Sequence, residues 1–369
     1  MSTAATEGIA LPRTGEAGAL QSAWPYMAAA ALIASAVAAF AAWMQPVPNP
    51  DALYYLTAAE HFARGQWHEG FAVYRWPFYS LQIAGVMSFA GLEALPAAVV
   101  VDIAYSAGLA AVFVDLIGRL SDRDRPSLLI AALLIGFNAR LAHWAPAVVR
   151  DHGYWFFLLA AVTTAVSDRQ HPATAKKLLL MAEMALATLF RIEGAFLFVV
   201  VPGFLLWSNA RSRAVRLLIP VAVACLSLAG VLGYALWNGG GWAGFHQFDN
   251  VIAHRIAVLD ASLIDPFYAN GRIWYVGMAI ATLFAAMLRA YSHVFAILGL
   301  AAFFPRRLMQ REAAGTFFWF ALGQLPALAI FATLQLFLPW RYAIGMALVG
   351  TIPIVFVLRA GWQEWWEGW

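Results

Sequence analysis

Cysteine and charge are what this 369-residue chain has least of. Its single cysteine, Cys225, lies in an apolar run, so neither a disulfide framework nor a cysteine-based metal site is expected. Charged residues make up only 12% of the chain, whereas 63% is hydrophobic, and a soluble domain carries about twice that share of charge. This composition excludes an ordinary soluble enzyme and predicts an all-α polytopic membrane protein.

Lysine is almost absent, and the basic residues never form a long run. The two lysines, Lys176 and Lys177, and most arginines stand in short loops between apolar segments, which does not indicate a nucleic-acid partner. Residues 1–23 are polar and rich in small residues, so we expect a disordered cytoplasmic N-terminus. They lack a signal-peptide pattern, so the apolar run 24–44 is expected to remain as a membrane anchor.

The apolar runs predict about ten membrane spans within a single transmembrane domain, residues 24–359. Two shorter runs, 77–92 and 272–283, are flanked by polar loops, and we interpret them as juxtamembrane helices. The ten expected spans are 24–44, 97–118, 127–142, 153–167, 177–190, 193–207, 214–237, 284–304, 315–337 and 342–358.

The distribution of positive charge predicts which loops face the cytoplasm. With the N-terminus inside, the loops around 119–125, 169–177, 211–216 and 306–311 each hold three basic residues, as the positive-inside rule requires. The large outer loops are then 45–96 and 238–283, with short outer turns at 143–152, 191–193 and 338–341. Few cations are expected outside unless they have a function there. The outer arginines are Arg64, Arg75, Arg140, Arg150, Arg191, Arg255, Arg272, Arg289 and Arg341.

Residues 47–65, directly after the first span, are predicted to form a helix, with capping signals at both ends. Asn49 is a candidate N-cap, Pro50 suits the first helical position, and Gly65 is a candidate stop. Asp51 then falls in the first turn, where the helix dipole favours an ionised carboxylate. Asp51 could act as a general base, or it could simply complement the helix end.

The rest of the first outer loop offers aromatic and cationic side chains for substrate binding. Helical spacing places Tyr54 and Tyr55 next to Asp51, and Arg75 begins an arginine-aromatic run where the chain re-enters the membrane. Glu60 and Arg64 have the spacing of a structural ion pair. An interfacial aromatic belt explains these aromatics as well as stacking on a substrate does.

Further carboxylates stand at the outer ends of later spans. Asp151 opens the fourth span and could support catalysis, pair with Arg150, or help hold a divalent cation such as Mg²⁺ or Mn²⁺. No fixed ligand spacing favours the metal. Asp102, near the outer end of the second span, is a further candidate for the substrate site.

Two later outer turns supply recessed cations. Arg191 and Glu193 interrupt an apolar stretch and cannot face lipid unpaired, so they form either a structural ion pair or part of a phosphate site in a cavity. Arg341 and Tyr342 open the last span, and the arginine could bind phosphate or reach toward the interface.

Two remaining features lie late in the chain. His246 begins a polar helical stripe in loop 238–283 that could contact an acceptor or form a solvated face. Residues 360–369 form a tail expected to lie as an interfacial anchor, because its tryptophans share one helical face. Those tryptophans are Trp362, Trp365, Trp366 and Trp369.

This ordered set of motifs resembles the GT-C superfamily of polytopic glycosyltransferases, in the group of the protein O-mannosyltransferases and the lipid A aminoarabinose transferases. The resemblance covers most of residues 24–358, with the motifs in the same order along the chain. The motifs are Asp51-Ala-Leu-Tyr-Tyr, the Trp76-Pro77-Phe-Tyr entry, Asp151, the turn with Arg191, Glu193 and Gly194, and the Arg341-Tyr342 pair. The chain departs from the family at Ala52, where a second acid is common, and at Trp76 in place of a proline.

The resemblance implies a glycosyltransferase that takes a monosaccharide from a polyprenyl-phosphate donor. Asp51 would be the general base, and the second catalytic residue, Asp151, would support the acceptor or a metal. Arg191, Arg341 and Tyr342 would bind the donor phosphate at the outer face of a bacterial inner membrane. The acceptor would be a glycan, a lipid or a protein. A transporter or flippase for a lipid-linked or anionic substrate, and a Wzy-like polymerase or ligase, are the alternatives.

Overall fold

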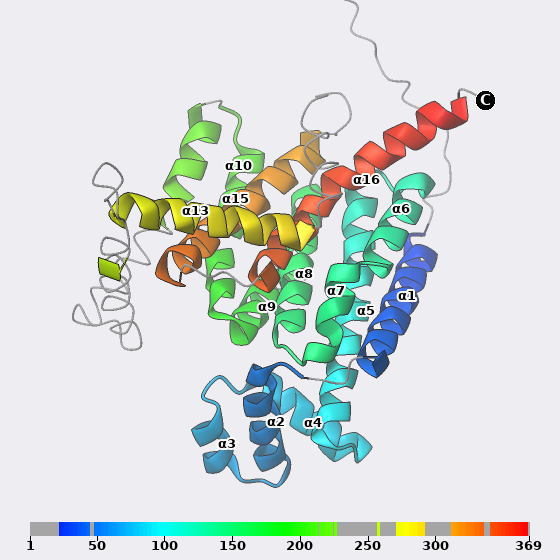
Figure 1. The fold of residues 1–369 in the computed structure, drawn as a ribbon. Coiled ribbons are helices and arrows are strands. Elements are labelled where there is room, and N and C mark those ends of the chain that lie inside the picture. Colours follow the sequence, from blue (N-terminus) through cyan, green and yellow to red (C-terminus); the bar gives the residue numbers. More distant parts are fainter. Residues whose placement is uncertain are drawn as a thin grey trace, which may run out of the picture.

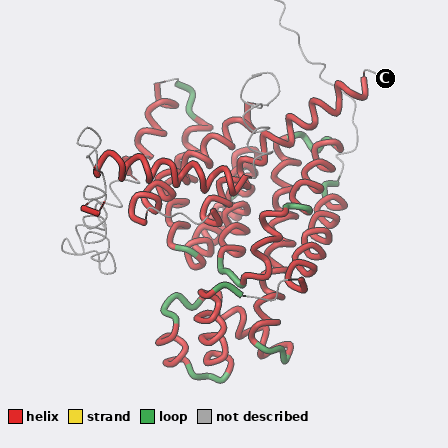
Figure 2. Tube along the Cα trace, viewed as in Figure 1, coloured by secondary structure: helices red, strands yellow, loops and turns green. Residues whose placement is uncertain are grey.

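A computed structural model describes residues 22–44, 48–212, 214–223, 225–226, 257–258, 271–291, 311–335 and 340–367. Within these ranges all regular structure is helical and no strand occurs (Figure 1, Figure 2). The helices are α1 (Trp24–Met44), α2 (Pro50–Ala63), α3 (Trp67–Val73), α4 (Phe78–Ala90), α5 (Ala94–Leu120), α6 (Arg125–Gly136), α7 (Ala139–Trp144), η1 (Ala145–Ala147), α8 (Asp151–Gln170), α9 (Thr174–Phe190), η2 (Ile192–Phe196), α10 (Leu197–Asn209), α13 (Gly271–Tyr291), α15 (Arg311–Gln335), η3 (Trp340–Ala343) and α16 (Ile344–Glu367). The chain is a helical membrane protein.

Six helical segments of the described part are long and apolar enough to cross a membrane, against about ten predicted. These are Trp24–Met44, Ala94–Leu120, Arg125–Ala147, Ile192–Asn209, Trp274–Tyr291 and Trp340–Trp365. The predicted spans 153–167 and 177–190 correspond to α8 and α9. Helix α8 is buried along most of its length and therefore tolerates polar side chains that would be costly in lipid.

Three predicted boundaries differ from the structure. The span predicted at 127–142 is broken at Asn138, whose side chain caps α7 through the backbone N–H groups of Arg140 and Leu141. The expected break near residue 283 is absent, because α13 is one continuous helix. The tail is the end of α16, with Trp362 and Trp365 exposed, rather than a separate helix.

Helices α2, α3 and α4 form a cap at one end of the bundle (Figure 1). The predicted ends of α2 are confirmed. The side chain of Asn49 accepts a hydrogen bond from the backbone N–H of Asp51, and Gly65 adopts a φ of +74° just past the helix. The predicted Glu60–Arg64 pair also forms, at 3.4 Å. Tyr54 and Tyr55 do not share one environment, because Tyr54 is exposed and Tyr55 is buried.

The predicted outer turns 143–152 and 191–193 and the start of the last span lie at the end of the bundle that carries this cap, whereas most of loop 238–283 lies outside the described residues. The backbone N–H of Asn49 donates to the carbonyl of Ala147 at 2.9 Å, which joins the start of α2 to η1. Contacts at the other end join the loops predicted to be cytoplasmic, where Arg359 lies 3.1 Å from Asp124. Loop 119–125 and turn 143–152 thus lie at opposite ends of the bundle, as their predicted sides require.

Phe190 is the aromatic centre of the packing beneath the cap. It is fully buried at the end of α9, and its ring contacts those of Phe78, Tyr79, Tyr105 and Phe157 from α4, α5 and α8. Glycine is needed opposite it at position 153, because a Cβ there would lie 2.2 Å from the Phe190 ring. This cluster fixes the first turn of α8 against the last turn of α9.

We predict that Phe190→Ala lowers the free energy of unfolding by about 3–5 kcal/mol, because it leaves a cavity among four rings. Thermal unfolding of the purified chain in detergent would measure the loss. Leu189→Ala is the matched control, because its side chain is 44% exposed and its removal opens no core cavity. Equal destabilisation by the two substitutions would contradict this role for Phe190.

Candidate functional site

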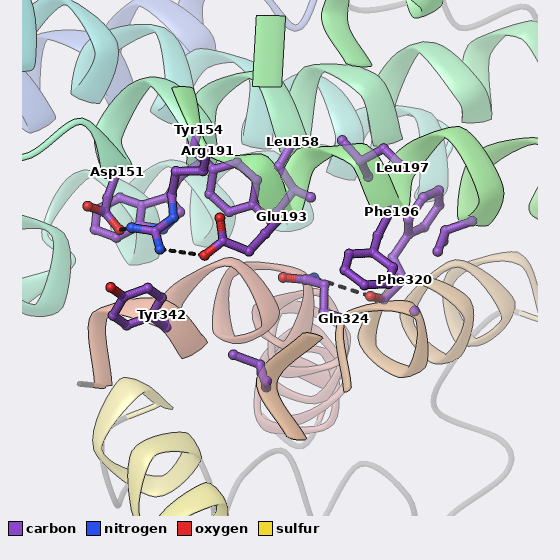
Figure 3. A pocket seen from close by; sticks show the side chains of 14 residues that line it. Asp151, Tyr154, Leu158, Arg191, Glu193, Phe196, Leu197, Phe320, Gln324 and Tyr342 are labelled. Atoms are coloured by element: carbon purple, nitrogen blue, oxygen red, sulfur yellow. Dashed lines mark hydrogen bonds and ion pairs between the residues drawn. The ribbon is translucent and has the colours of Figure 1, made fainter. Parts of the chain in front are cut away.

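Arg191 is held between two carboxylates at the capped end of the bundle (Figure 3). Its Nη1 donates to Oδ1 of Asp151 at 2.7 Å, and its Nη2 donates to Oε1 of Glu193 at 2.5 Å. The Arg191 side chain is only 5% exposed. A buried guanidinium requires such compensation, so the pairing predicted from the sequence exists, with Asp151 as an additional partner.

A second ion pair links the first outer loop to the last span. Nη2 of Arg341 donates to Oδ2 of Asp51 at 2.8 Å, across 290 positions of sequence. The ring of Tyr342 lies beside both arginines, 4.1 Å from Cζ of Arg191 and 5.5 Å from Cζ of Arg341. Tyr342 thereby joins the two ion pairs into one cluster.

Helix starts and one unusual turn position the carboxylates of the cluster. Asp51 and Asp151 both stand in the first turn of a helix, α2 and α8, where free N–H groups favour an anion. Just before α8, Val148 has a φ of +52°, which is unusual for a β-branched residue and typical of functional turns. This turn lets the chain reverse from η1 and start α8 with Asp151 inside the cluster.

A pocket with an empty volume of about 580 Å³ extends from this cluster between α8, η2, α10, α15 and η3. Its polar end is formed by Asp151, Tyr154, Arg191, Glu193, Gln324 and Tyr342. Its other walls are apolar and include Leu158, Phe196, Leu197, Val200, Phe320 and Leu328 (Figure 3). A charged head and an apolar wall suit a ligand with a polar group on a hydrocarbon chain.

The phenols near Asp51 are poorly suited to act as bases. Burial raises the pKa of Tyr55 and Tyr74 above the usual value of a phenol, so both remain protonated at neutral pH. Their rings meet edge to face, with centroids 4.9 Å apart. The Asp51 side chain is 48% exposed, which leaves this carboxylate open to solvent and to an incoming acceptor.

The structure brings together six of the residues predicted for the site: Asp51, Asp151, Arg191, Glu193, Arg341 and Tyr342. Tyr55 lies behind Asp51, whereas Tyr54 and Arg75 are exposed on the cap. Asp102 does not line the pocket. It is fully buried, accepts a hydrogen bond from Tyr79 at 2.8 Å, and lies 3.6 Å from His152. His246 lies outside the residues that the structure describes.

Several neighbours of the cluster escaped prediction. Trp144 packs against Arg341 at 5.5 Å, and Tyr154 and Gln324 line the pocket. Arg150, considered only as a partner for Asp151, instead lies over the ring of Tyr74 at 5.9 Å. Helical spacing could have indicated Tyr154, which stands one turn after Asp151. The others depend on contacts between distant segments.

The carboxylates near the pocket do not assemble a metal site. No group of three or more His, Cys, Asp or Glu side chains that could hold an ion occurs within the described ranges. Asp151 and Glu193, the nearest pair, both direct an oxygen at Arg191. Among these residues the guanidinium occupies the position that a divalent cation would need.

Comparisons with protein-family models, with curated proteins and with solved structures found no match to this chain.

We predict that Asp151→Asn lowers the free energy of unfolding by about 3 kcal/mol, because it removes one charge partner from the buried Arg191. The measurement is thermal unfolding in detergent. Glu60→Gln breaks an exposed ion pair on the cap and should cost less than about 1 kcal/mol. An Asp151→Asn chain as stable as Glu60→Gln would show that the Arg191 network contributes little to the fold.

Proposed function

We propose that this protein is a membrane glycosyltransferase of the GT-C type that moves a monosaccharide from a polyprenyl-phosphate donor to an acceptor. The observation that carries the proposal is the Asp51–Arg341 contact beside an amphipathic pocket. A carboxylate, an arginine and an apolar wall are the groups that such a transfer needs. The positive-inside pattern supports an outward-facing position for this end, and the proposal includes a bacterial inner membrane with this end toward the periplasm.

Arg341 is the cation best suited to the donor phosphate. Its side chain is 11% exposed, and its buried Nε finds no hydrogen-bond partner among the described residues. A buried N–H without a partner is costly, and a phosphate oxygen would satisfy it. Arg191 already pairs with two carboxylates, so we assign it to holding Asp151 and Glu193 in place rather than to direct phosphate binding.

The 2.8 Å contact between Asp51 and Arg341 also restricts the mechanism. In an inverting transfer the base and the leaving phosphate lie on opposite sides of the anomeric carbon, so the two residues must separate when the sugar enters. We infer that the donor phosphate takes the place of Asp51 on Arg341. Donor binding would then release the Asp51 carboxylate to face the acceptor.

In the proposed reaction the acceptor oxygen attacks the anomeric carbon while its proton passes to Asp51. The bond between that carbon and the phosphate oxygen breaks, and polyprenyl phosphate leaves with the electron pair. Arg341 stabilises the negative charge that develops on the phosphate. The apolar wall of the pocket, including Leu158, Leu197 and Val200, would accommodate the first part of the lipid chain.

The position of the charged cluster argues against a transporter or flippase. Such proteins bind substrate near the middle of the membrane, commonly at broken helices. Here Asp51, Asp151, Arg191 and Arg341 lie at helix ends, in turns on one end of the bundle.

We predict that Asp51→Asn lowers the transfer rate by about 10²–10⁴-fold, as expected for the loss of a general base, while the fold is kept. Membranes containing the full chain would be incubated with a panel of labelled polyprenyl-phosphate sugars, and transfer would be measured. Glu60→Gln, on the same helix but paired only with Arg64, should retain wild-type activity. Asp51→Asn activity near wild type would remove Asp51 from the chemistry.

A further inference from the structure

A second cation-lined pocket lies between α7, α13 and α16, apart from the pocket beside Arg191. Its empty volume is about 290 Å³, and none of its lining residues lines the first pocket. Asn138 and Arg140 lie at its polar side. The apolar side is formed by Ala290 and by Ile344, Ala347 and Leu348, which follow one face of α16.

Arg140 is the unexplained residue of this pocket. It lies in the segment Arg125–Ala147, which is apolar enough to cross a membrane, yet it makes no ion pair with any residue that the structure describes. Its guanidinium instead lies over the ring of Trp340, with Cζ 5.2 Å from the centroid. A cation in a membrane-spanning segment normally has an anionic partner.

Asn138 supplies a second free donor at the same place. Its Oδ1 accepts the backbone N–H groups of Arg140 and Leu141, which fixes the side chain and leaves its Nδ2 group without a described partner. The other polar side chains of the pocket are already engaged. Tyr291 donates to the carbonyl of Met346, and Thr351 donates to the carbonyl of Ala347.

We propose that this pocket binds the phosphate group of a membrane lipid, with Arg140 and Asn138 as the donors and the lipid chain against α16. Charge complementarity favours a phosphate, because the pocket offers only unpaired donors at its polar side and a line of small and aliphatic side chains beyond it. Arginine suits phosphate through its planar set of N–H donors. A tryptophan beside the cation is typical of a membrane interface.

This lipid site is distinct from the donor site under the proposed function. The two arginines lie against different indoles: Arg140 over Trp340, and Arg341 over Trp144 at 5.5 Å. The two indole centroids are 5.1 Å apart. A lipid bound at Arg140 would therefore pack against the aromatic pair that supports Arg341, which gives the site a route for influencing the active end.

The test is native mass spectrometry of the full chain in non-ionic detergent, titrated with phosphatidylglycerol, with diacylglycerol, or with sodium phosphate. We expect the wild type to retain phosphatidylglycerol and not diacylglycerol, and Arg140→Gln to bind it about tenfold more weakly through loss of a charge-assisted contact. Arg75→Gln, which removes an exposed arginine of the cap, is the matched control and should bind like the wild type.

Asn138→Asp separates binding from folding. Aspartate caps a helix as well as asparagine does, so α7 should be preserved, while the free amide donor is replaced by a negative charge. Weaker lipid binding with an unchanged melting temperature is expected. Equal binding by wild type, Arg140→Gln and Asn138→Asp would overturn the site. Saturation by sodium phosphate with no retention of phosphatidylglycerol would overturn its assignment to a lipid.

These outcomes do not depend on the transferase proposal. Asp51→Asn and Arg341→Gln should both keep the lipid at Arg140, because neither residue lines this pocket. Loss of transfer activity in Asp51→Asn with no lipid effect in Arg140→Gln would support the transferase and reject the lipid site. Weaker lipid binding by Arg140→Gln, with unchanged transfer activity in Asp51→Asn, would support the lipid site and reject the transferase.

Discussion

The buried guanidinium of Arg191 is the interaction on which the capped end of this protein depends. It ties the first residue of α8 to the turn after α9, through Asp151 and Glu193. A cation with 5% exposure near a membrane cannot remain without anions, so its two partners determine how these turns pack. The Phe190 cluster and the close approach at Gly153 support the same junction from below.

This junction has a consequence for the role of each charge. Three carboxylates, Asp51, Asp151 and Glu193, face only two guanidinium groups in the cluster. Arg191 is already paired with both Asp151 and Glu193, so these buried ion pairs suit a structural role. The pair at the rim, Asp51 with Arg341, combines an exposed carboxylate with an arginine that keeps an unused N–H. Chemistry that needs a mobile proton acceptor and a cation is therefore best placed at the rim.

The sequence predicted the ends of α2 and the group of outer turns that meet at one end of the bundle. Asn49, Pro50 and Gly65 predicted the ends of α2 because capping depends on neighbouring residues. The alternation of apolar runs predicted that Asp51, Asp151, Arg191 and Arg341 meet at one end. The sequence predicted the local pair of Arg191 with Glu193, but not the pairs Arg191–Asp151 and Arg341–Asp51, because these depend on side-chain packing between distant turns.

Other misses have the same cause. Hydropathy cannot distinguish a lipid-facing span from a buried helix such as α8, whose polar side chains are covered by neighbours. The run 272–304 seemed to divide at residue 283, yet α13 passes through that point without a break. Asp102 is a site candidate because a membrane carboxylate is unusual, and the structure shows it fully buried, where it accepts a hydrogen bond from Tyr79 of α4.

Cross-linking of residues 51 and 341 is the most direct test of the proposed transfer site. In a Cys225→Ser background, the chain carrying Asp51→Cys and Arg341→Cys would be treated in membranes with a short bifunctional thiol reagent. Linked peptides would then be sought by mass spectrometry. We predict an intramolecular link here and none between Asp51→Cys and Arg359→Cys, because Arg359 lies beside Asp124 at the opposite end. Absence of the first link, with each cysteine reactive on its own, would contradict the convergence on which the proposed transfer site depends.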